Sequence, residues 1–216
     1  MLKILFNKIK IILFLIKISK INILENGKFN KKNNYKKLQV FLKNKKIALV
    51  GNSPKLLNFK NNIDEYDVVI RINLLPLKKH YKFVGKRCDI MMMSSGPIKL
   101  IDENFIKIYF STNKKYIVKY AKGETYVFPT KYYKILFNKI KSRPTTGMMA
   151  LFFLIKLIRN PKITLFGFDH TPTSWYANEY RAKISSSKHD FLKEKKLFLY
   201  FSKKYKGINY SNKLKK

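Results

Sequence analysis

Cysteine is nearly absent from this sequence. Cys88 is the only one in 216 residues, so an internal disulfide is excluded. Chains without disulfides are typical of a reducing compartment, and the cytoplasm is therefore the expected location. Cys88 precedes an apolar run, a position that favours packing over a role as a nucleophile. The length suits one domain with a sizeable core and is short for two.

Acidic residues are also scarce. The chain has 12 Asp and Glu against 47 Lys and Arg, a formal net charge of +35. Such a field attracts polyanions, either nucleic acid or an anionic membrane. The sequence is at the same time rich in Lys, Ile, Asn and Phe, as a codon bias toward A and T would make it, so a purely compositional origin of the charge stays open. No aromatic residues interleave with the lysines in a recognisable nucleic-acid module, and no specific nucleic acid is expected.

Two further kinds of motif are missing. The sequence has no D-x-D triplet and no His/Cys cluster with metal-ligand spacing, so we expect no metal ion and no other cofactor. The G-x-G-x-x-G pattern does not follow the first apolar strand. These absences argue against a nicotinamide enzyme of the Rossmann type and against a metal centre.

The N-terminus lacks a long uncharged run. In residues 1–24 the longest such stretch is 11–16, far below the roughly 20 residues that cross a bilayer. On a helix Lys3, Lys10 and Lys17 share one face, and Leu, Ile and Phe cover most of the rest. This pattern predicts an amphipathic helix over 1–24 in the plane of the inner membrane face. A signal peptide and an ordinary helix packed on the domain are the alternatives.

The rest of the chain reads as a linker followed by one folded unit. Residues 25–45 are rich in Asn and Lys and predict a polar linker, and the folded domain is expected over 46–210. Short apolar runs predict strands at 47–50, 68–72, 89–93, 106–110, 126–128 and 163–166, and helices are predicted at 132–141, 148–158 and 188–203. The expected fold is a single α/β domain with a Rossmann-like, mostly parallel sheet flanked by helices. The Lys-rich last dozen residues are predicted to fray.

The most informative stretch runs from residue 47 to 73. An apolar strand leads into the tight turn GNSP at 51–54, a helix-length segment follows, and a second apolar strand ends in RIN at 71–73. This order opens many nucleotide-binding α/β domains. Asn52 and Asn73 each follow a strand, at the sheet edge where such domains bind ligands, and their amides both donate and accept hydrogen bonds. The alternative is that Asn52 only shapes the turn.

A second segment begins at Arg143. Thr145, Thr146 and Gly147 start a helix that is apolar nearly all round and therefore predicted to be buried. Backbone N–H groups and the positive end of the helix dipole make such a start a ready anion site. The alternative is that Thr145 only caps the helix.

A third segment carries His189 and Glu194 in the pattern H-x4-E. An unperturbed imidazole titrates near pH ~6.5, so a histidine can accept a proton from a hydroxyl at neutral pH. Glu194 lies five residues on, off the same helix face, and is expected to support the site rather than contact substrate. Serines after two other strands, including Ser94, are further candidate contacts.

Taken in order, the three segments resemble glycosyltransferase family 29, the sialyltransferases. IALVGNSPKLL…IDEYDVVIRIN resembles the family's long sialyl motif, RPTTGMMALFFLIKL…ITLFGFD resembles its short motif, and His189 with Glu194 resembles its very short motif. The resemblance covers roughly residues 46–198 and implies a glycosyltransferase-A-like sialyltransferase variant of the fold. Residues 46–210 would then form the catalytic domain.

The resemblance implies an inverting transfer of sialic acid, or a related acid sugar such as Kdo, from its CMP-activated donor to a glycan or glycolipid hydroxyl. His189 would be the base and Glu194 its support. The residues implied to hold the nucleotide or its phosphate are Gly51, Asn52, Ser53, Arg71, Asn73, Thr145, Thr146 and Gly147. The rival from another class is a basic membrane- or nucleic-acid-binding protein that keeps the fold without turnover.

The chain departs from the family's pattern in two ways. The animal enzymes pair cysteines of the long and short motifs, and this chain has none there. The family also places a His-Tyr-aromatic-acid segment, associated with the leaving group, before the catalytic histidine. The corresponding region here has no histidine, so His170 upstream or Tyr176 within it is the candidate substitute.

Overall fold

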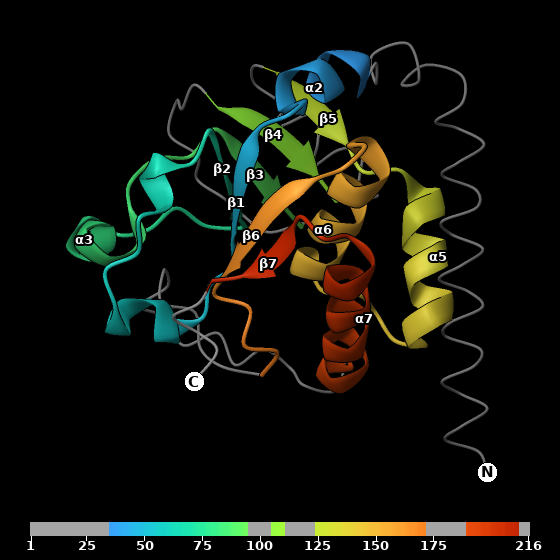
Figure 1. The fold of residues 1–216 in the computed structure, drawn as a ribbon. Coiled ribbons are helices and arrows are strands. Elements are labelled where there is room, and N and C mark those ends of the chain that lie inside the picture. The colour runs from blue at the N-terminus through green and yellow to red at the C-terminus, as the bar shows by residue number, and fades with distance from the viewer. Residues whose placement is uncertain (1–34, 95–104, 111–123, 172–188, 212–216) are drawn as a thin grey trace.

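The fold is built on a seven-stranded sheet in the order β5-β4-β3-β2-β1-β6-β7, and all neighbouring strands run parallel. The computed structural model describes residues 35–94, 105–110, 124–171 and 189–211 (Figure 1). The strands are β1 Lys46–Val50, β2 Val68–Ile72, β3 Ile90–Met93, β4 Ile106–Tyr109, β5 Thr125–Val127, β6 Lys162–Phe166 and β7 Ile208–Tyr210. The chain moves outward from β1 through β2 to β5 and then returns to the other side of β1 with β6, so β1 marks the switch point of the sheet.

Helices cover both faces of the sheet. They are α2 Tyr35–Leu42, α3 Tyr81–Val84, α5 Thr130–Ile140, α6 Thr146–Leu157 and α7 Phe191–Lys204, with short 3-10 turns η1 Pro54–Asn58, η2 Ile63–Glu65 and η3 Lys78–His80. Figure 1 shows α5, α6 and α7 gathered on one side and α3 on the other. Because both faces are covered, the strands read as continuous apolar runs instead of alternating ones.

Alternate residues of β1 divide the core in two. Ile47 and Leu49 belong to the large cluster beneath α6, whereas Ala48 and Val50 belong to a smaller cluster under η1, η2 and α3. Helix α6 lies at the centre of the larger cluster, and the nine residues of this helix that are buried explain its apolar sequence. The central strands and α6 therefore form the rigid base from which the loops at the carboxyl edge extend.

Most elements match their predicted positions. The six predicted strands and the three helices of 132–141, 148–158 and 188–203 are present with shifted ends, and the α/β class with a parallel sheet is confirmed. The predicted helix at 1–24 lies outside the described residues. None of the helices that the structure describes is long and apolar enough to cross a membrane.

Three expectations were wrong. The segment between β1 and β2 forms the 3-10 turns η1 and η2 rather than a helix, since Pro54 starts a short turn that ends after five residues. The predicted linker contains α2, whose Leu38 and Leu42 are fully buried, so the folded unit begins before residue 46. The predicted frayed tail contains β7, which pairs with β6.

Candidate functional site

A cavity of about 270 Å³ lies at the carboxyl edge of the sheet. It opens where β1, β2 and β6 end and where α6 and α7 begin, which is the switch-point position at which open parallel sheets bind ligands. Its lining comes from five parts of the chain: residues 51–53, 72–73 with 94, 143–149, 167–171 and 189–198. All three motif segments identified in the sequence therefore meet at one cavity.

The floor of the cavity is a close contact between two loops. The Gly51 N–H donates to the Phe166 carbonyl over 2.8 Å, and a Cβ on Gly51 would stand 2.6 Å from the Gly167 carbonyl oxygen. Gly167 itself has φ +69, which a side chain disfavours. Both glycines are needed because the loops after β1 and β6 touch along their backbones.

The two residues after Gly51 are already hydrogen-bonded to the protein. The Asn52 Nδ2 donates to the Ile72 carbonyl over 2.8 Å, so the amide oxygen Oδ1 remains as a hydrogen-bond acceptor for a ligand. The Ser53 hydroxyl donates to Asp169 over 2.8 Å and accepts from the Lys55 N–H that it caps. Asn52 thus has an acceptor left for a ligand, whereas Ser53 mainly ties the β1 turn to the loop after β6.

Asn73 is held from three sides. It has φ +63, its N–H donates to the Met92 carbonyl over 2.8 Å, and its Oδ1 accepts from the Ser94 N–H and hydroxyl over 3.0 and 3.3 Å. Both lone pairs of Oδ1 are then engaged, and the donors on Nδ2 are what the side chain can still offer. Asn52 and Asn73 therefore present opposite hydrogen-bonding groups, one acceptor and one donor pair, at the same edge.

The α6 start combines a cap with unused donors. The Thr145 hydroxyl accepts from the Met148 N–H over 3.2 Å, while the Met149 N–H bonds the Thr145 carbonyl as the first intrahelical bond. The N–H groups of Thr146 and Gly147 precede that first bond and so have no acceptor within the helix. With the helix dipole they make the cavity wall favourable for an anion.

Glu194 fixes this helix start from α7. One carboxylate oxygen accepts from the Thr145 N–H and the other from the Thr145 hydroxyl, each over 2.6 Å. The side chain is 1% exposed, and burial raises its pKa to about 7 against the opposing effect of the two Thr145 bonds. Glu194 therefore holds the α6 start in place, and its role as a support that does not contact substrate stays a prediction.

His189 stands at the cavity beside the α7 start. Its Nδ1 lies 2.7 Å from the Arg143 carbonyl oxygen, which can only accept, so Nδ1 carries the hydrogen. In the neutral ring the lone pair is then on Nε2. The carboxylate of the next residue, Asp190, accepts from the Lys193 N–H, and the Asp190 backbone N–H donates to Ser142 Oγ over 3.2 Å. Two hydrogen bonds thus join the segment before α6 to the segment before α7.

His170 also lines the cavity. Its backbone is left-handed, with φ +55, and its ring packs edge-on against Phe198 with 4.7 Å between centroids. Its Nε2 lies 2.8 Å from the Tyr210 hydroxyl. Burial lowers the pKa of His170 to about 4, so the ring is neutral at physiological pH.

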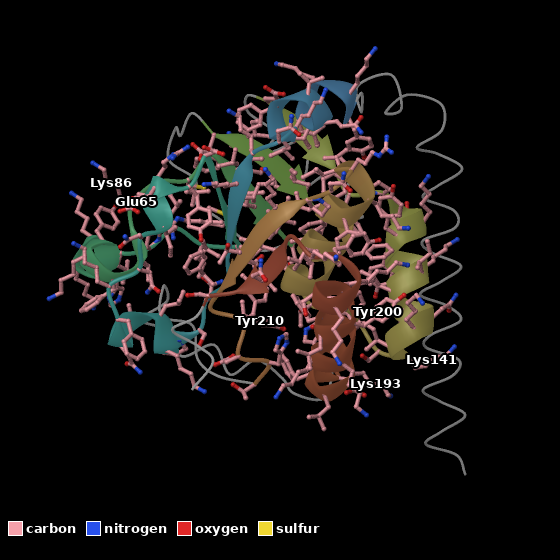
Figure 2. All side chains as sticks on the ribbon, in the orientation of Figure 1. Glu65, Lys86, Lys141, Lys193, Tyr200 and Tyr210 are labelled. Carbon is pink, nitrogen blue, oxygen red and sulfur yellow. The ribbon has the colours of Figure 1, made fainter. Side chains whose placement is uncertain are left out.

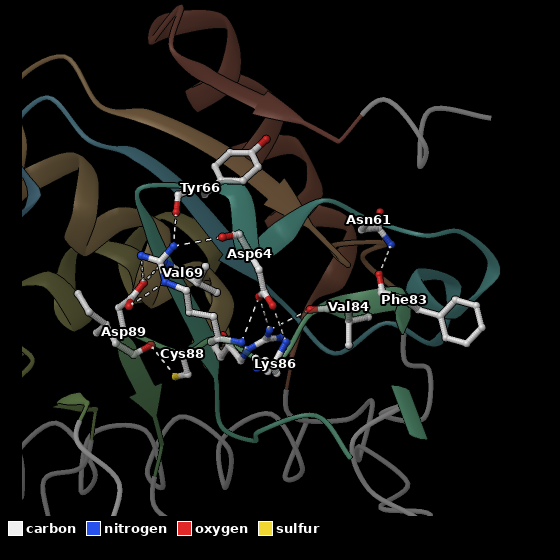
Figure 3. A network of polar contacts seen from close by, with 12 residues as sticks. Asn61, Asp64, Tyr66, Val69, Phe83, Val84, Lys86, Cys88 and Asp89 are labelled. Atoms are coloured by element: carbon white, nitrogen blue, oxygen red, sulfur yellow. Dashed lines mark hydrogen bonds and ion pairs between the residues drawn. The ribbon is translucent and has the colours of Figure 1, made fainter. Parts of the chain in front are cut away.

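Arg71 does not belong to this cavity. Its Nε and Nη2 donate to the Arg87 and Val84 carbonyls over 2.7 and 2.8 Å, and Nη2 is 3.9 Å from Asp64. The side chain is 1% exposed and serves the packing of the segment after α3. Figure 3 shows this region, where the Lys86 N–H donates to Asp64 and Val84 lies close by. Its prediction as a nucleotide-binding residue is corrected: Arg71 lies within β2 and contacts the segments of η2 and α3, whereas Asn73 follows the end of the strand with φ +63 and lines the cavity.

Of the remaining predicted site residues, Gly147 and Thr146 lie at the cavity. Gly147 lies against the Phe168 ring, since a Cβ there would meet a ring carbon at 2.7 Å, and Thr146 is buried in the cavity wall. Tyr176 lies outside the described residues. Among the described residues no group of three His, Cys, Asp or Glu side chains is arranged to hold a metal ion.

Two contributors were missed from the sequence. Asp169 is the last residue of the short motif, and its carboxylate accepts the Ser53 hydrogen bond; its position after β6 is the signal that could have identified it. Tyr210 reaches His170 from β7, and nothing in the Lys-rich tail indicated a strand there. A short strand at the far edge of a parallel sheet carries too few residues for its pattern to stand out.

Comparison with known proteins agrees with this geometry. Residues 25–134, about half of the chain, match the family described as glycosyltransferase family 29 (sialyltransferase). The curated sialyltransferase-like protein 2 of Arabidopsis thaliana is 33% identical over 60 residues, which is 27% of this chain and only 14% of that protein.

Solved structures show the same fold. The crystal structure of a mammalian sialyltransferase matches with a TM-score of 0.59 at 16% identity, over 77% of this chain and 68% of that one. A second structure, a mammalian sialyltransferase in complex with Gal-beta-1-3GalNAc-ortho-nitrophenol, matches with a TM-score of 0.58 at 15% identity, over 76% and 68%. With the family match over its N-terminal half, a shared fold and the three motif segments meeting at one cavity, the chain belongs to glycosyltransferase family 29, the sialyltransferases.

Proposed function

We propose that this protein transfers sialic acid, or a related acid sugar such as Kdo, from its CMP-activated donor to a glycan hydroxyl with inversion at the anomeric carbon. The observation that carries the proposal is the Glu194 bridge. It joins the anion-binding start of α6 to the helix that begins beside His189. A helix start for a phosphate and an imidazole for a hydroxyl then face one cavity, as a single displacement requires.

The nucleotide would be held by complementary amides. A cytosine edge offers an amino donor beside acceptor atoms, and the Asn52 oxygen with the Asn73 amino group supplies the matching acceptor and donors. Uracil reverses both, because its position 4 is a carbonyl acceptor and its N3 carries a hydrogen. The arrangement therefore favours cytidine over uridine nucleotides.

The phosphate would meet the N–H groups of Thr146 and Gly147. Their partial positive charge stabilises the charge that develops on the departing monophosphate. The proposal needs no metal ion for this step, and Thr145 keeps the helix start rigid because Glu194 holds both its N–H and its hydroxyl.

His189 would act as the general base. The acceptor hydroxyl gives its proton to Nε2, the acceptor oxygen forms a bond to the anomeric carbon, and the bond from that carbon to the phosphate oxygen breaks with its electrons. The Arg143 carbonyl stabilises the imidazolium that results, because it accepts from Nδ1–H throughout. The base therefore needs no second proton transfer to complete the step.

We also propose that the protein works at an anionic membrane surface and takes a lipid-linked or lipopolysaccharide-type acceptor. The outer face of α7 carries Leu192, Leu199 and Tyr200, which are 74%, 42% and 51% exposed, together with the exposed Lys196 and Lys203. Figure 2 shows Tyr200 on this helix. Apolar side chains among lysines fit a surface with acyl chains beneath negative headgroups, as does the net charge of +35.

Sedimentation with vesicles tests this proposal. Binding to phosphatidylglycerol vesicles that falls in a Leu192→Ser/Leu199→Ser variant supports it, and equal binding to neutral vesicles contradicts it.

The experiment for the transfer itself follows release of CMP from CMP-sialic acid and CMP-Kdo. Acceptors would include Gal-beta-1-3GalNAc, the sugar bound by one solved relative, and lipid-linked glycans. Acceptor-dependent CMP release from either donor supports the proposal. Steep, salt-dependent polyanion binding without CMP release or CMP binding would instead favour the basic, non-catalytic alternative.

A further inference from the structure

The hydroxyl of Tyr210 meets His170 behind the wall of the cavity. Residue 210 ends β7, pairs with Leu165 of β6, and is held in place because the Ser211 N–H donates to the Leu165 carbonyl over 2.9 Å. Figure 2 shows Tyr210 on the sheet beside α7. The contact thus joins the last strand of the fold to the loop that follows β6.

We infer that Tyr210 is a positioning residue that donates its hydroxyl hydrogen to His170 Nε2 and thereby holds His170 as the Nδ1–H tautomer, a neutral donor for a phosphate oxygen of the bound nucleotide. This inference rests on the proposed nucleotide site. It adds Tyr210 as the residue that sets the hydrogen position of His170, which the sequence already offered as a candidate for the leaving-group role.

The first argument is the hydrogen balance of the pair. A neutral imidazole has one donor and one acceptor nitrogen, and Nε2 lies 2.8 Å from the Tyr210 oxygen. If Nε2 carried the hydrogen, the Tyr210 hydroxyl hydrogen would have no acceptor among the described residues. If Nδ1 carries the hydrogen, the Tyr210 hydroxyl donates to the lone pair of Nε2, and the Nδ1 hydrogen remains for a ligand.

The second argument is the position of Nδ1. Among the described residues Nδ1 of His170 has no hydrogen-bond partner, and His170 lines the cavity. Its N–H is therefore offered on the side where the ligand would bind.

The third argument is that both groups keep their protons in place across physiological pH. Burial lowers the pKa of His170 to about 4 and raises that of Tyr210 to about 12. The charged groups that act on the ring are Asp169, which favours protonation, and Lys195 of α7, which opposes it. The ring is thus a neutral donor, and it adds an N–H for an anion beside the Asp169 carboxylate without adding a full charge.

The experiment uses the full chain labelled with ¹⁵N-histidine, whose three histidines give separable long-range ¹H–¹⁵N patterns. A His170→Asn variant assigns the signal. The inference expects the Nδ1–H tautomer for His170 in the wild type and a shift toward Nε2–H in Tyr210→Phe. Tyr205→Phe, a matched change of a half-buried tyrosine nearby, is expected to leave the tautomer unchanged. A predominant Nε2–H form in the wild type, or an unchanged Nδ1–H form in Tyr210→Phe, overturns the inference.

Ligand titration provides the second measurement. Tyr210→Phe should weaken binding of CMP by about tenfold and leave binding of cytidine, which has no phosphate, within twofold. Equal loss for both ligands would overturn the assignment of His170 to the phosphate. If the wild type binds neither ligand, the proposed function fails, while the tautomer measurement still decides whether Tyr210 sets the state of His170.

Discussion

Two polar clusters flank β2, and they use their hydrogen-bonding groups in opposite ways. One surrounds Arg71 and Arg87 on the face covered by η2 and α3, and the other lines the cavity at the carboxyl edge. In the first cluster almost every donor and acceptor is hydrogen-bonded within the protein. In the second, several donors and acceptors that face the cavity have no partner among the described residues, and this difference separates a structural network from a binding site.

The arginine network is nearly saturated. The Arg87 guanidinium donates to the carbonyls of Asp64, Tyr66 and Asp67 over 2.6–3.2 Å and pairs with Asp89 at 2.9 Å. Asp89 in turn accepts from the Val69 N–H over 2.7 Å. These bonds fix the segments between β1, β2 and β3, which the chain's lack of disulfides leaves to noncovalent contacts.

The cavity cluster is only half saturated. Asn52 uses its donor and keeps an acceptor, Asn73 uses its acceptor and keeps its donors, and His170 uses Nε2 alone. Each side chain is oriented by its protein contact and offers its other side to the cavity.

The largest effect is expected at His189. His189→Ala should lower transfer by about 10²- to 10⁴-fold while CMP affinity stays within a few-fold, because the base acts on the acceptor and not on the nucleotide. Turnover and calorimetric titration measure the two quantities. His80→Ala, on η3 and away from the cavity, is the control and should keep full activity. Near-normal turnover in His189→Ala would remove the base assignment.

Arg71 should show the reverse pattern. Arg71→Met should lower the free energy of unfolding by about 3–5 kcal/mol, since the Arg87 and Val84 carbonyls and Asp64 lose a buried partner. The stabilisation by CMP should remain, because the side chain does not reach the cavity. Urea unfolding measures the loss, and the exposed Arg159→Met should change it by less than about 0.5 kcal/mol. Loss of CMP binding in a folded Arg71→Met protein would return Arg71 to the site.

Glu194 links the cavity to pH. Its folded pKa of about 7 exceeds its ordinary 4.5, so the folded protein binds the proton more tightly and loses stability as pH rises through this window. Glu194→Gln removes the titration. The stability of the variant relative to the wild type should therefore rise, by on the order of 3 kcal/mol, between pH 4.5 and about 8. Paired unfolding curves measure this difference, and a difference independent of pH would show that Glu194 does not titrate in this range.

Thr145 should give the smallest of these effects. Thr145→Val keeps the shape but loses the cap to the Met148 N–H and the hydroxyl donor to Glu194, at a cost of about 1–2 kcal/mol. CMP affinity should fall several-fold as the helix start loosens. Thr145→Ser restores the hydroxyl and should recover both quantities in unfolding and titration experiments. A stable Thr145→Val protein with weakened CMP binding would instead assign Thr145 a direct contact.

The sequence predicted the central sheet and the motif segments well, because β1, β2, α6 and β6 are long apolar runs next to small-residue turns. It did not predict α2, where Leu38 and Leu42 are two buried residues in a lysine-rich background. It assigned Arg71 to the site because Arg71 is two residues from Asn73, although Arg71 lies inside β2 and Asn73 follows the end of this strand with φ +63. The support from Tyr210 depends on strand pairing far along the chain, which local patterns do not encode.

The central claim is that the Asn52 oxygen, the Asn73 amino group and the N–H groups at the start of α6 recognise cytidine monophosphate. The most direct measurement is the thermal shift of the wild-type protein with CMP, UMP and GMP at equal concentration, repeated with Asn73→Ala. The account predicts that CMP raises the melting temperature most and that Asn73→Ala removes most of this increase. Equal shifts with all three nucleotides, or none with CMP, would contradict it.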